Sequence, residues 1–206
     1  MKPSDSEQRG PFFFVGGNRA VDFVNTLAAN ANGPVDLLES ADSVAQWSLL
    51  SGLFNEEQSR RLGEALRADP SRGALESVRE LRSALHAILA LAGTGKDFAD
   101  VAALRLNPIL EKMPLSLRAT SNERRLGVEF TASEGTGPVD EFKGRVAQEA
   151  LNLLVSADPN HIRKCANPAC VLYFHDTTKN HRRLWCSMAA CGNRAKASRF
   201  RRRQQA

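Results

Sequence analysis

Apolar and polar positions along much of the chain alternate with the 3.6-residue period that is typical of amphipathic helices. The clearest case is a long helix that is predicted to end at Gly93-Thr94-Gly95. The apolar residues that follow the helical period are Leu75, Val78, Leu81, Leu85, Ile88 and Leu89. Capping residues and helix breakers predict five further helices. Their approximate ranges are 18–29, 41–51, 55–68, a short helix from 98 that the prolines at 108 and 114 limit, and 139–156.

The limits of the first three helices follow from particular residues. Asn18 is a candidate cap for the first helix, whose apolar side carries Val21, Val24 and Leu27. We expect a loop from Asn30 to Pro34, and a second helix that stops at Gly52. Asn55, with Gln58 three residues later, resembles a capping box for the third helix.

Strand patterns occur in two places. Phe12 to Val15 is a short apolar run before Gly16-Gly17, and Leu115–Ala119 and Leu126–Thr131 are expected to form a β-hairpin. Asp158-Pro159 marks a domain boundary by composition. We therefore predict an α+β protein with a flexible tail over 1–10, a mostly helical domain with a small β-sheet over 11–158, and a second domain over 159–206.

Composition is that of a globular protein, but the charge is divided unevenly. The 206 residues are 42% hydrophobic and 25% charged, with a formal net charge of +5. Residues 160–206 hold 11 Lys and Arg against one acid, Asp176, whereas the preceding residues carry a net charge of −5. Such a basic segment favours a polyanionic partner. No apolar run is long enough for a membrane helix, and Met1–Gly10 lacks a signal-peptide pattern, so we expect a cytoplasmic protein.

The cysteines all lie in the basic segment. Cys165 and Cys170 form one C-x4-C pair, and Cys186 and Cys191 form a second pair after fifteen intervening residues. Two close pairs separated by a short loop are typical of a tetrathiolate Zn²⁺ site. Two disulfides are the first alternative, which a reducing cytoplasm disfavours, and unligated or redox-active thiols are the second.

The residues around the cysteines predict a treble-clef-like zinc finger. Asn167-Pro168 favours a tight turn within the first pair, Val171–Phe174 has a strand pattern, and a helix is expected from Ser187 onward, with the last cysteine pair at its start. This helix is basic, and a helix fits the major groove of B-DNA. The candidate DNA contacts are Arg182, Arg183, Arg194, Lys196, Arg199, Arg201, Arg202 and Arg203. The alternative is a solvated charged face.

Two short motifs extend this picture by resemblance. Trp185-Cys186-Ser187-Met188 and Cys191-Gly192-Asn193-Arg194, with Cys165–Cys170 and Asp176–Asn180 upstream, resemble the CGNR zinc-finger family. Phe23-Val24-Asn25-Thr26-Leu27 resembles the ABATE domain that precedes this finger. The resemblance implies a stress-induced transcription regulator, with DNA binding in the finger and ligand sensing in the first domain. His175 and Leu184 depart from the family pattern, which favours an apolar residue and an arginine there.

Several polar residues allow more than one interpretation. Asp22, Asn25 and Thr26 are candidate ligand-binding residues, or they form a buried hydrogen-bond network. Tyr173 and Trp185 could stack on bases, although packing around the zinc site is favoured. A local series of polar residues suggests an HNH-type metal nuclease: His175, Asp176, Asn180 and His181. The alternative is that the histidines are surface residues and that Asp176 forms a turn.

Together these patterns predict a transcription regulator that binds double-stranded DNA through a finger holding one structural Zn²⁺. We expect no enzymatic activity, no membrane association and a cytoplasmic, nucleoid-associated protein. A small-molecule effector and a homodimer are further expected partners. The alternatives are a zinc-dependent RNA- or protein-interaction module and, more remotely, the nuclease.

Overall fold

The structure is a computed structural model, and it describes residues 7–30, 33–92, 94, 97–122 and 125–204. The α-helices are α1 (Arg19–Val24), α2 (Ala41–Leu50), α3 (Glu56–Arg67), α4 (Gly73–Ala92), α5 (Ala99–Leu110), α6 (Pro138–Ser156) and α7 (Asn193–Gln204). The strands pair as antiparallel hairpins: β1 (Gln8–Arg9) with β2 (Phe12–Phe13), β3 (Leu27–Asn30) with β4 (Gly33–Asp36), β5 (Leu115–Asn122) with β6 (Arg125–Ala132), and β7 (Ile162–Lys164) with β8 (Tyr173–His175).

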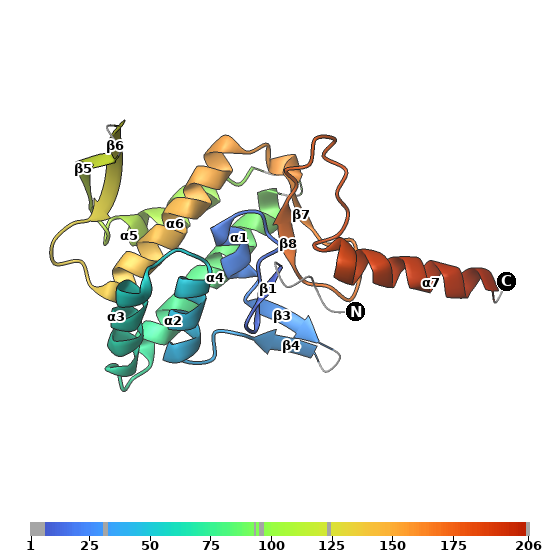
Figure 1. Cartoon of the computed structure of the whole chain (residues 1–206), viewed down its shortest axis with the longest axis horizontal. Helices are drawn as coiled ribbons and strands as arrows, with labels where there is room; N and C mark the ends of the chain where they lie inside the picture. Colours follow the sequence, from blue (N-terminus) through green and yellow to red (C-terminus); the bar gives the residue numbers. More distant parts are fainter. Residues whose placement is uncertain (1–6, 31–32, 93, 95–96, 123–124, 205–206) are drawn as a thin grey trace.

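We call the described residues up to 157 the body, and those from 158 to 204 the module. In the body α4 and α6 run past each other, α2 and α3 pack as a pair at one end, and α1 lies against both long helices (Figure 1). The β5–β6 hairpin and α7 project from opposite ends of the molecule (Figure 1). No helix in the described part of the chain is long and apolar enough to span a membrane.

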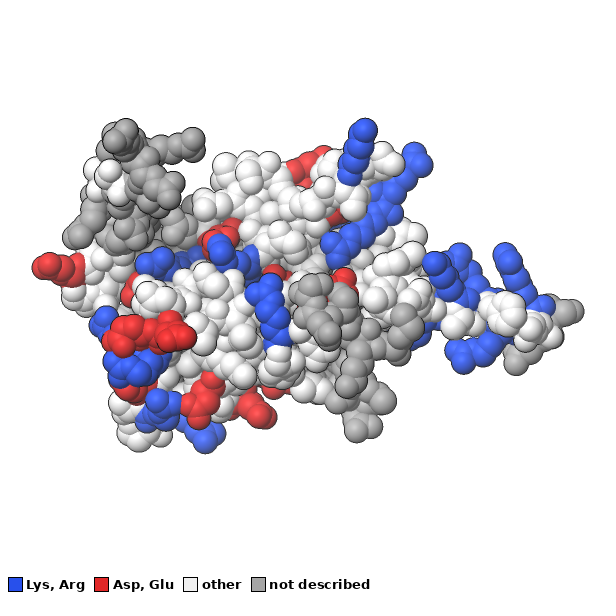
Figure 2. All heavy atoms as spheres, viewed as in Figure 1, with Lys and Arg blue, Asp and Glu red and all other residues white. Residues whose placement is uncertain are grey.

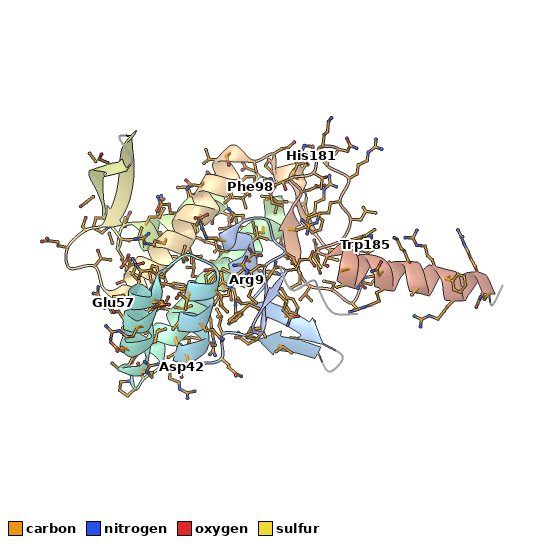
Figure 3. All side chains as sticks on the ribbon, in the orientation of Figure 1. Arg9, Asp42, Glu57, Phe98, His181 and Trp185 are labelled. Carbon is orange, nitrogen blue, oxygen red and sulfur yellow. The ribbon has the colours of Figure 1, made fainter. Side chains whose placement is uncertain are left out.

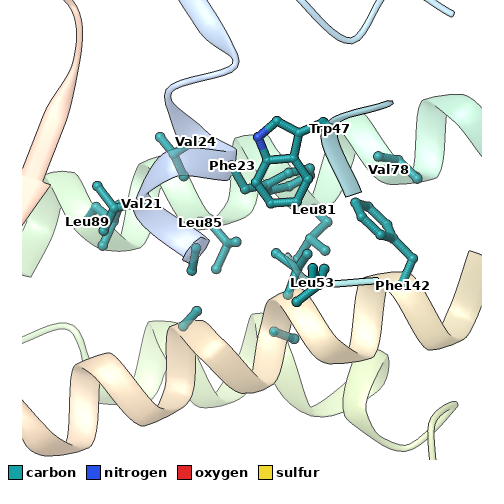
Figure 4. Close-up of a cluster of buried hydrophobic side chains, with 14 of the residues drawn as sticks. Val21, Phe23, Val24, Trp47, Leu53, Val78, Leu81, Leu85, Leu89 and Phe142 are labelled. Atoms are coloured by element: carbon teal, nitrogen blue, oxygen red, sulfur yellow. The ribbon is translucent and has the colours of Figure 1, made fainter. Parts of the chain in front are cut away.

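Three aromatic rings form the centre of the body (Figure 4). Phe23 of α1, Trp47 of α2 and Phe142 of α6 meet edge to face, with centroid separations of 5.2 to 6.0 Å. Edge-to-face contact aligns the positive edge of one ring with the negative face of the next. The predicted apolar side of α4 belongs to the same buried cluster. Its residues Val78, Leu81, Leu85, Ile88 and Leu89 are all buried.

Most of the predicted helix limits are confirmed. The Asn55 side chain accepts the Gln58 N–H at 2.9 Å, and the Gln58 side chain accepts the Asn55 N–H at 3.1 Å, which completes the capping box. Gly52 follows α2 with a φ of +69°, a conformation that disfavours any side chain with a Cβ. The β5–β6 hairpin is also confirmed, with strands that extend a few residues beyond the predicted ones.

The first predicted helix, over 18–29, is wrong at its C-terminal end. Asn18 caps it as expected, but α1 stops at Val24 because the Thr26 hydroxyl donates to the Phe23 carbonyl at 2.6 Å and turns the chain. Leu27 is 41% exposed instead of buried, because it begins strand β3. The loop expected at Asn30–Pro34 is correspondingly too long, since β4 already begins at Gly33.

Two smaller predictions also need correction. Pro108 does not limit α5, which ends two residues later at Leu110. The carbonyl that loses its partner to proline belongs to Leu104, whose side chain is 77% exposed, so solvent can satisfy it. Within the tail expected over 1–10, Gln8 and Arg9 form β1, and residues 1–6 lie outside the described residues.

The module packs directly on the body instead of hanging from it. Ile162 of β7 and Tyr173 of β8 belong to the body's buried cluster. In return, Val15 and Ala28 of the body belong to a second buried cluster that includes Cys165, Cys186 and Cys191. Each part therefore completes the apolar core of the other.

Candidate metal centre and nucleic-acid interface

The four cysteine sulfurs converge on one point. The Sγ atoms of Cys165, Cys170, Cys186 and Cys191 all lie within 4.8 Å of one another. Cys186 Sγ is 3.7 Å from Cys170 Sγ and 3.7 Å from Cys191 Sγ. A tetrahedron with Zn–S bonds of about 2.3 Å has edges of about 3.8 Å, so these separations match a zinc tetrathiolate. A disulfide requires about 2.05 Å, so the alternative of two disulfides is wrong.

The first pair is set by the Asn-Pro turn that the sequence predicts. The Cys170 N–H donates to the Asn167 carbonyl at 2.8 Å, and the Ala169 N–H donates to the Asn167 side chain at 3.1 Å. At the other end of the turn, the Cys165 N–H donates to the Leu172 carbonyl at 2.9 Å. These bonds close the loop so that both sulfurs face the same side.

The second pair brackets the start of the C-terminal helix. Cys186 directly precedes Ser187, whose hydroxyl caps a single π-helical turn, Met188–Gly192, that leads into α7. Cys191 lies in that turn, and its N–H donates to the Ser187 carbonyl at 3.0 Å. The helix predicted from Ser187 with the second cysteine pair at its start is therefore confirmed, with an irregular first turn.

The surroundings favour deprotonated sulfurs. The Cys186 N–H donates to Cys165 Sγ at 3.4 Å, and the Asn167 side-chain amide donates to Cys191 Sγ at 3.4 Å. Donors aimed at sulfur stabilise the thiolate, which is the form that binds metal. The site therefore fits one structural Zn²⁺, held by all four cysteines.

Gly192 gives Trp185 room beside the metal site. A Cβ at Gly192 would lie 3.2 Å from Trp185 Cδ1 and 2.2 Å from Met188 Sδ. Trp185 packs against the cysteine cluster at the base of α7 (Figure 3). Tyr173 is buried, with its ring edge-on to His86 at 5.3 Å. Trp185 therefore packs beside the zinc site as the favoured interpretation expects, whereas Tyr173 packs in the body's buried cluster and not around the zinc site.

Basic side chains cover α7 on the exposed side of the metal site. Figure 2 shows Lys and Arg gathered along this helix, with no acidic residue among them on the face drawn. The described side chains that are exposed are Arg182, Arg194, Lys196, Arg199, Arg201 and Arg203; that of Arg202 lies outside the described residues. A groove of about 540 Å³ follows the helix between Arg194, Arg199 and Arg201 on one side and Pro168 and Trp185 on the other.

Comparison with known families assigns each of the two parts to a family. The model of the ABATE family, whose description is "Putative stress-induced transcription regulator", matches residues 17–157. The chain belongs to the ABATE family. A second model, the CGNR zinc finger, matches residues 161–204. The resemblances carried by Phe23–Leu27 and by Cys191–Arg194 are thereby confirmed. A comparison with curated proteins found no match.

Within the CGNR finger, Arg183 has a different position from the other predicted DNA contacts. Its guanidinium donates to the Val15 carbonyl at 2.9 Å, to the Trp185 carbonyl at 2.9 Å and to the Cys186 carbonyl. The same group lies 4.4 Å above the Phe174 ring. Arg183 thus joins the finger to the ABATE domain, and a free cationic role is left to its exposed neighbour Arg182.

The histidines and the acid that suggested a nuclease have structural partners in the finger. Asp176 is fully buried, and its carboxylate accepts the Thr178 hydroxyl at 2.6 Å and the N–H groups of Thr178 and Arg183 at 3.0 and 2.8 Å. His181 stacks on His161 with 3.6 Å between centroids. Among the described residues, the only cluster with metal-binding geometry is that of the cysteines. This favours the turn role of Asp176 that the sequence left open.

The three candidate ligand residues of the ABATE domain lie at its junction with the finger. Asn25 is buried, and its side chain exchanges two hydrogen bonds with the Tyr173 backbone, at 2.9 and 2.8 Å. Asp22 accepts the Gly16 N–H at 2.7 Å, and burial raises the pKa of its carboxyl to about 7. Thr26 accepts from Arg82 at 3.2 Å. These bonds favour the buried network, and a ligand contact at these residues stays a prediction.

Sequence reasoning missed the partner of Thr26. Arg82 is buried on α4, and its guanidinium binds the Asp36 carboxylate through two bonds of 2.6 and 2.7 Å. These bonds attach the β3–β4 hairpin to α4. The sequence contained one signal of this buried arginine. Arg82 directly follows Leu81, on the side of α4 that otherwise carries apolar residues.

Proposed function

We propose that this protein regulates transcription by binding double-stranded DNA with α7 and the adjoining loop of the CGNR finger. The observation that carries the proposal is the single sign of charge on an exposed helix, since Asn193–Gln204 contains five Arg and one Lys and no acid. A helix of this diameter fits the major groove, where arginine can contact both phosphates and guanine edges.

The distribution of charge over the whole chain also supports a complex in which α7 faces the DNA. Residues 160–206 carry a net charge of +10 and the preceding residues carry −5. A Zn²⁺ ion with four thiolates contributes −2, so the loaded finger keeps a net charge of about +8. The ABATE domain is then repelled by the phosphates while the finger is attracted, which aims α7 at the duplex.

A salt titration of DNA binding tests the proposal. For about five to eight phosphate contacts, the slope of log affinity against log salt should be roughly −4 to −7. Replacing Arg199 and Arg201 together by alanine should reduce the magnitude of that slope by about 2. The matched control replaces Arg60 and Arg61 of α3, which removes the same charge from exposed positions outside the finger. Equal losses in both double variants would contradict the proposed interface.

The choice of nucleic acid separates the proposal from its alternatives. Tighter binding to selected duplexes than to random DNA supports a regulator, whereas equal affinity for random duplex and RNA favours a non-specific interaction module. The proposal contains no catalytic step, so plasmid nicking that His175→Ala abolishes would contradict it. A homodimer on two half-sites, in the cytoplasm and at the nucleoid, completes the proposal, and sedimentation with and without DNA measures the dimer.

A further inference from the structure

A cavity of about 360 Å³ lies where the ABATE domain meets the finger. Its walls on the ABATE side are Phe13, Val15 and Ala28. On the finger side they include Leu172 and Ala190. Three of the zinc ligands, Cys170, Cys186 and Cys191, complete the lining. The cavity therefore touches the apolar cluster that both parts share.

The walls favour an apolar occupant. Val15 and Ala28 on one side and Leu172 on the other are each buried, so both sides of the cavity contribute aliphatic groups. Polar side chains are few among the described lining residues, and Gln8, Ser187 and Arg194 supply them. Small-molecule sites commonly combine mostly apolar walls with a few polar groups that fix orientation.

The charges along the walls have opposite signs, so each kind of ion meets repulsion at one part of the cavity. A zinc tetrathiolate carries a net charge of −2, so an anion beside Cys170 and Cys186 is repelled. Arg194 is the one Lys or Arg among the described lining residues, and its guanidinium repels a cation. A neutral molecule with an acceptor oxygen has no such cost, and Arg194 can donate to that oxygen.

We propose that this cavity binds a small, uncharged and mostly apolar molecule whose single hydrogen-bond acceptor faces Arg194. A cavity of about 150 Å³ accommodates benzene, so the larger space here suits a molecule of about ten to fifteen non-hydrogen atoms. The site differs from the Asp22, Asn25 and Thr26 set that the sequence suggested, because none of those side chains lines it.

The position of the cavity couples its occupant to α7. Arg194 lies in the first turn of α7, and Ala190 and Cys191 lie in the turn that precedes it. An occupant that engages the Arg194 guanidinium removes a cation that we expect to contact phosphate. This regulatory step rests on the proposed DNA binding, and we expect occupancy to weaken that binding several-fold.

Binding is tested first without DNA, on the zinc-loaded full chain. The probes are four bicyclic molecules of similar size: 1-indanone, indane, 1-aminoindane and indane-1-carboxylate. In an NMR titration, 1-indanone should bind with a Kd of about 0.1 to 1 mM, which is ordinary for a ligand of this size. The two ions should bind at least tenfold more weakly, and indane should bind more weakly than the ketone. Absence of 1-indanone binding, or tighter binding of either ion, would overturn the proposal.

Substitutions at the rim locate the binding. Ala29 on β3 and Ala169 in the finger line the cavity from opposite sides, and both are exposed, so a tryptophan there can fill the space without breaking the core. Ala29→Trp and Ala169→Trp should each weaken 1-indanone binding at least tenfold. The control is Ala103→Trp on α5, an exposed alanine that does not line the cavity. Unchanged affinity in both rim variants would place the ketone elsewhere and refute the site.

The DNA measurement is a separate arm with its own outcome. Saturating 1-indanone should lower the DNA affinity of the wild-type chain and leave that of Ala29→Trp unchanged. If the ketone binds but DNA affinity does not change, the coupling is wrong while the cavity site stands. If the chain binds no DNA at all, the proposed function fails, and the NMR titration still decides the cavity.

Discussion

The ABATE domain and the CGNR finger obtain their stability by different means. The ABATE domain buries a broad apolar cluster in which the rings of Phe23, Trp47 and Phe142 meet. The finger has a much smaller cluster, built around its cysteines and extended by Val15 and Ala28 from the other part. A segment of this size cannot bury enough apolar surface alone, so it depends on a metal and on a neighbour. The comparison shows a large core that the finger extends by Ile162 and Tyr173, and a small core that depends on a metal and on its neighbour.

Removal of the metal should separate the two regions most strongly. Zinc binding to small fingers contributes about 10 to 16 kcal/mol, so Cys186→Ser should unfold the finger and leave the ABATE domain folded. The chain has two tryptophans, Trp47 in the ABATE domain and Trp185 in the finger, and each reports on one region. Each Trp→Phe variant leaves one tryptophan as the reporter. Under chelation, the fluorescence of Trp185 in Trp47→Phe should change, and that of Trp47 in Trp185→Phe should stay the same.

The matched control for the metal experiment lies in the larger core. Phe142→Ala should destabilise the ABATE domain by about 3 to 5 kcal/mol, because it leaves a cavity beside Trp47. The Trp47 signal should then change at lower denaturant while zinc stays near one ion per chain. Simultaneous loss of both signals in either variant would show that the two regions unfold as one unit.

Acidity should act on the seam between the regions with a smaller effect. Burial raises the pKa of Asp22 from 3.8 to about 7. Its protonated form therefore favours folding fully below about pH 4, and that contribution is lost as the pH rises through 7. The loss is roughly 4 kcal/mol for a shift of this size. Urea unfolding of wild type and Asp22→Asn between about pH 4 and 8 measures it, and wild type should weaken relative to the variant, mainly between the two pKa values. A parallel pH dependence in both chains would contradict the assignment to Asp22.

The smallest expected effect is on the bonds between Asn25 and β8. Asn25→Ala leaves the buried Tyr173 N–H and carbonyl without these partners, which should cost about 1 to 3 kcal/mol. Amide hydrogen exchange should quicken at β7 and β8 more than at α4. Asn25→Asp places a carboxylate oxygen against the Tyr173 carbonyl at a buried site, so its exchange should be at least as fast as that of Asn25→Ala. Faster exchange spread evenly over the chain would contradict a local role for the hydrogen bonds between Asn25 and Tyr173.

Local chemistry made the metal site predictable. The zinc ligands lie in two short pairs, and the Asn167-Pro168 turn between the first two needs only neighbouring residues. The long helices were predictable for the same reason, since α4 carries its whole apolar stripe within one segment. A structural feature can be predicted from a short segment when all the residues that determine it lie within that segment.

Features that depend on distant residues were not predictable. The sequence leaves Asn25 open between a ligand contact and a buried network until Tyr173, 148 positions later, is placed beside it. The end of α1 depends on Thr26, which is held by Phe23 nearby and by Arg82 on another helix. Arg183 looked like a DNA contact because its backbone acceptor at Val15 is 168 positions away. The bonds of Asn25 and Arg183 have partners that the local pattern does not contain, whereas the end of α1 also involves the local bond from Thr26 to Phe23, which the helical period does not reveal.

The Asn25 contact also has a consequence for how such genes can be rearranged. A fusion that transfers the finger from residue 159 onward would leave behind the Asn25 amide, the Val15 carbonyl and the apolar wall of Ala28. The recipient would have to present an equivalent amide and aliphatic surface at the same spacing. A transfer of the finger is therefore constrained by its neighbour, and the segment that would have to move with it extends back to Glu7, just before β1, whose carboxylate accepts the Ser187 hydroxyl at 2.7 Å.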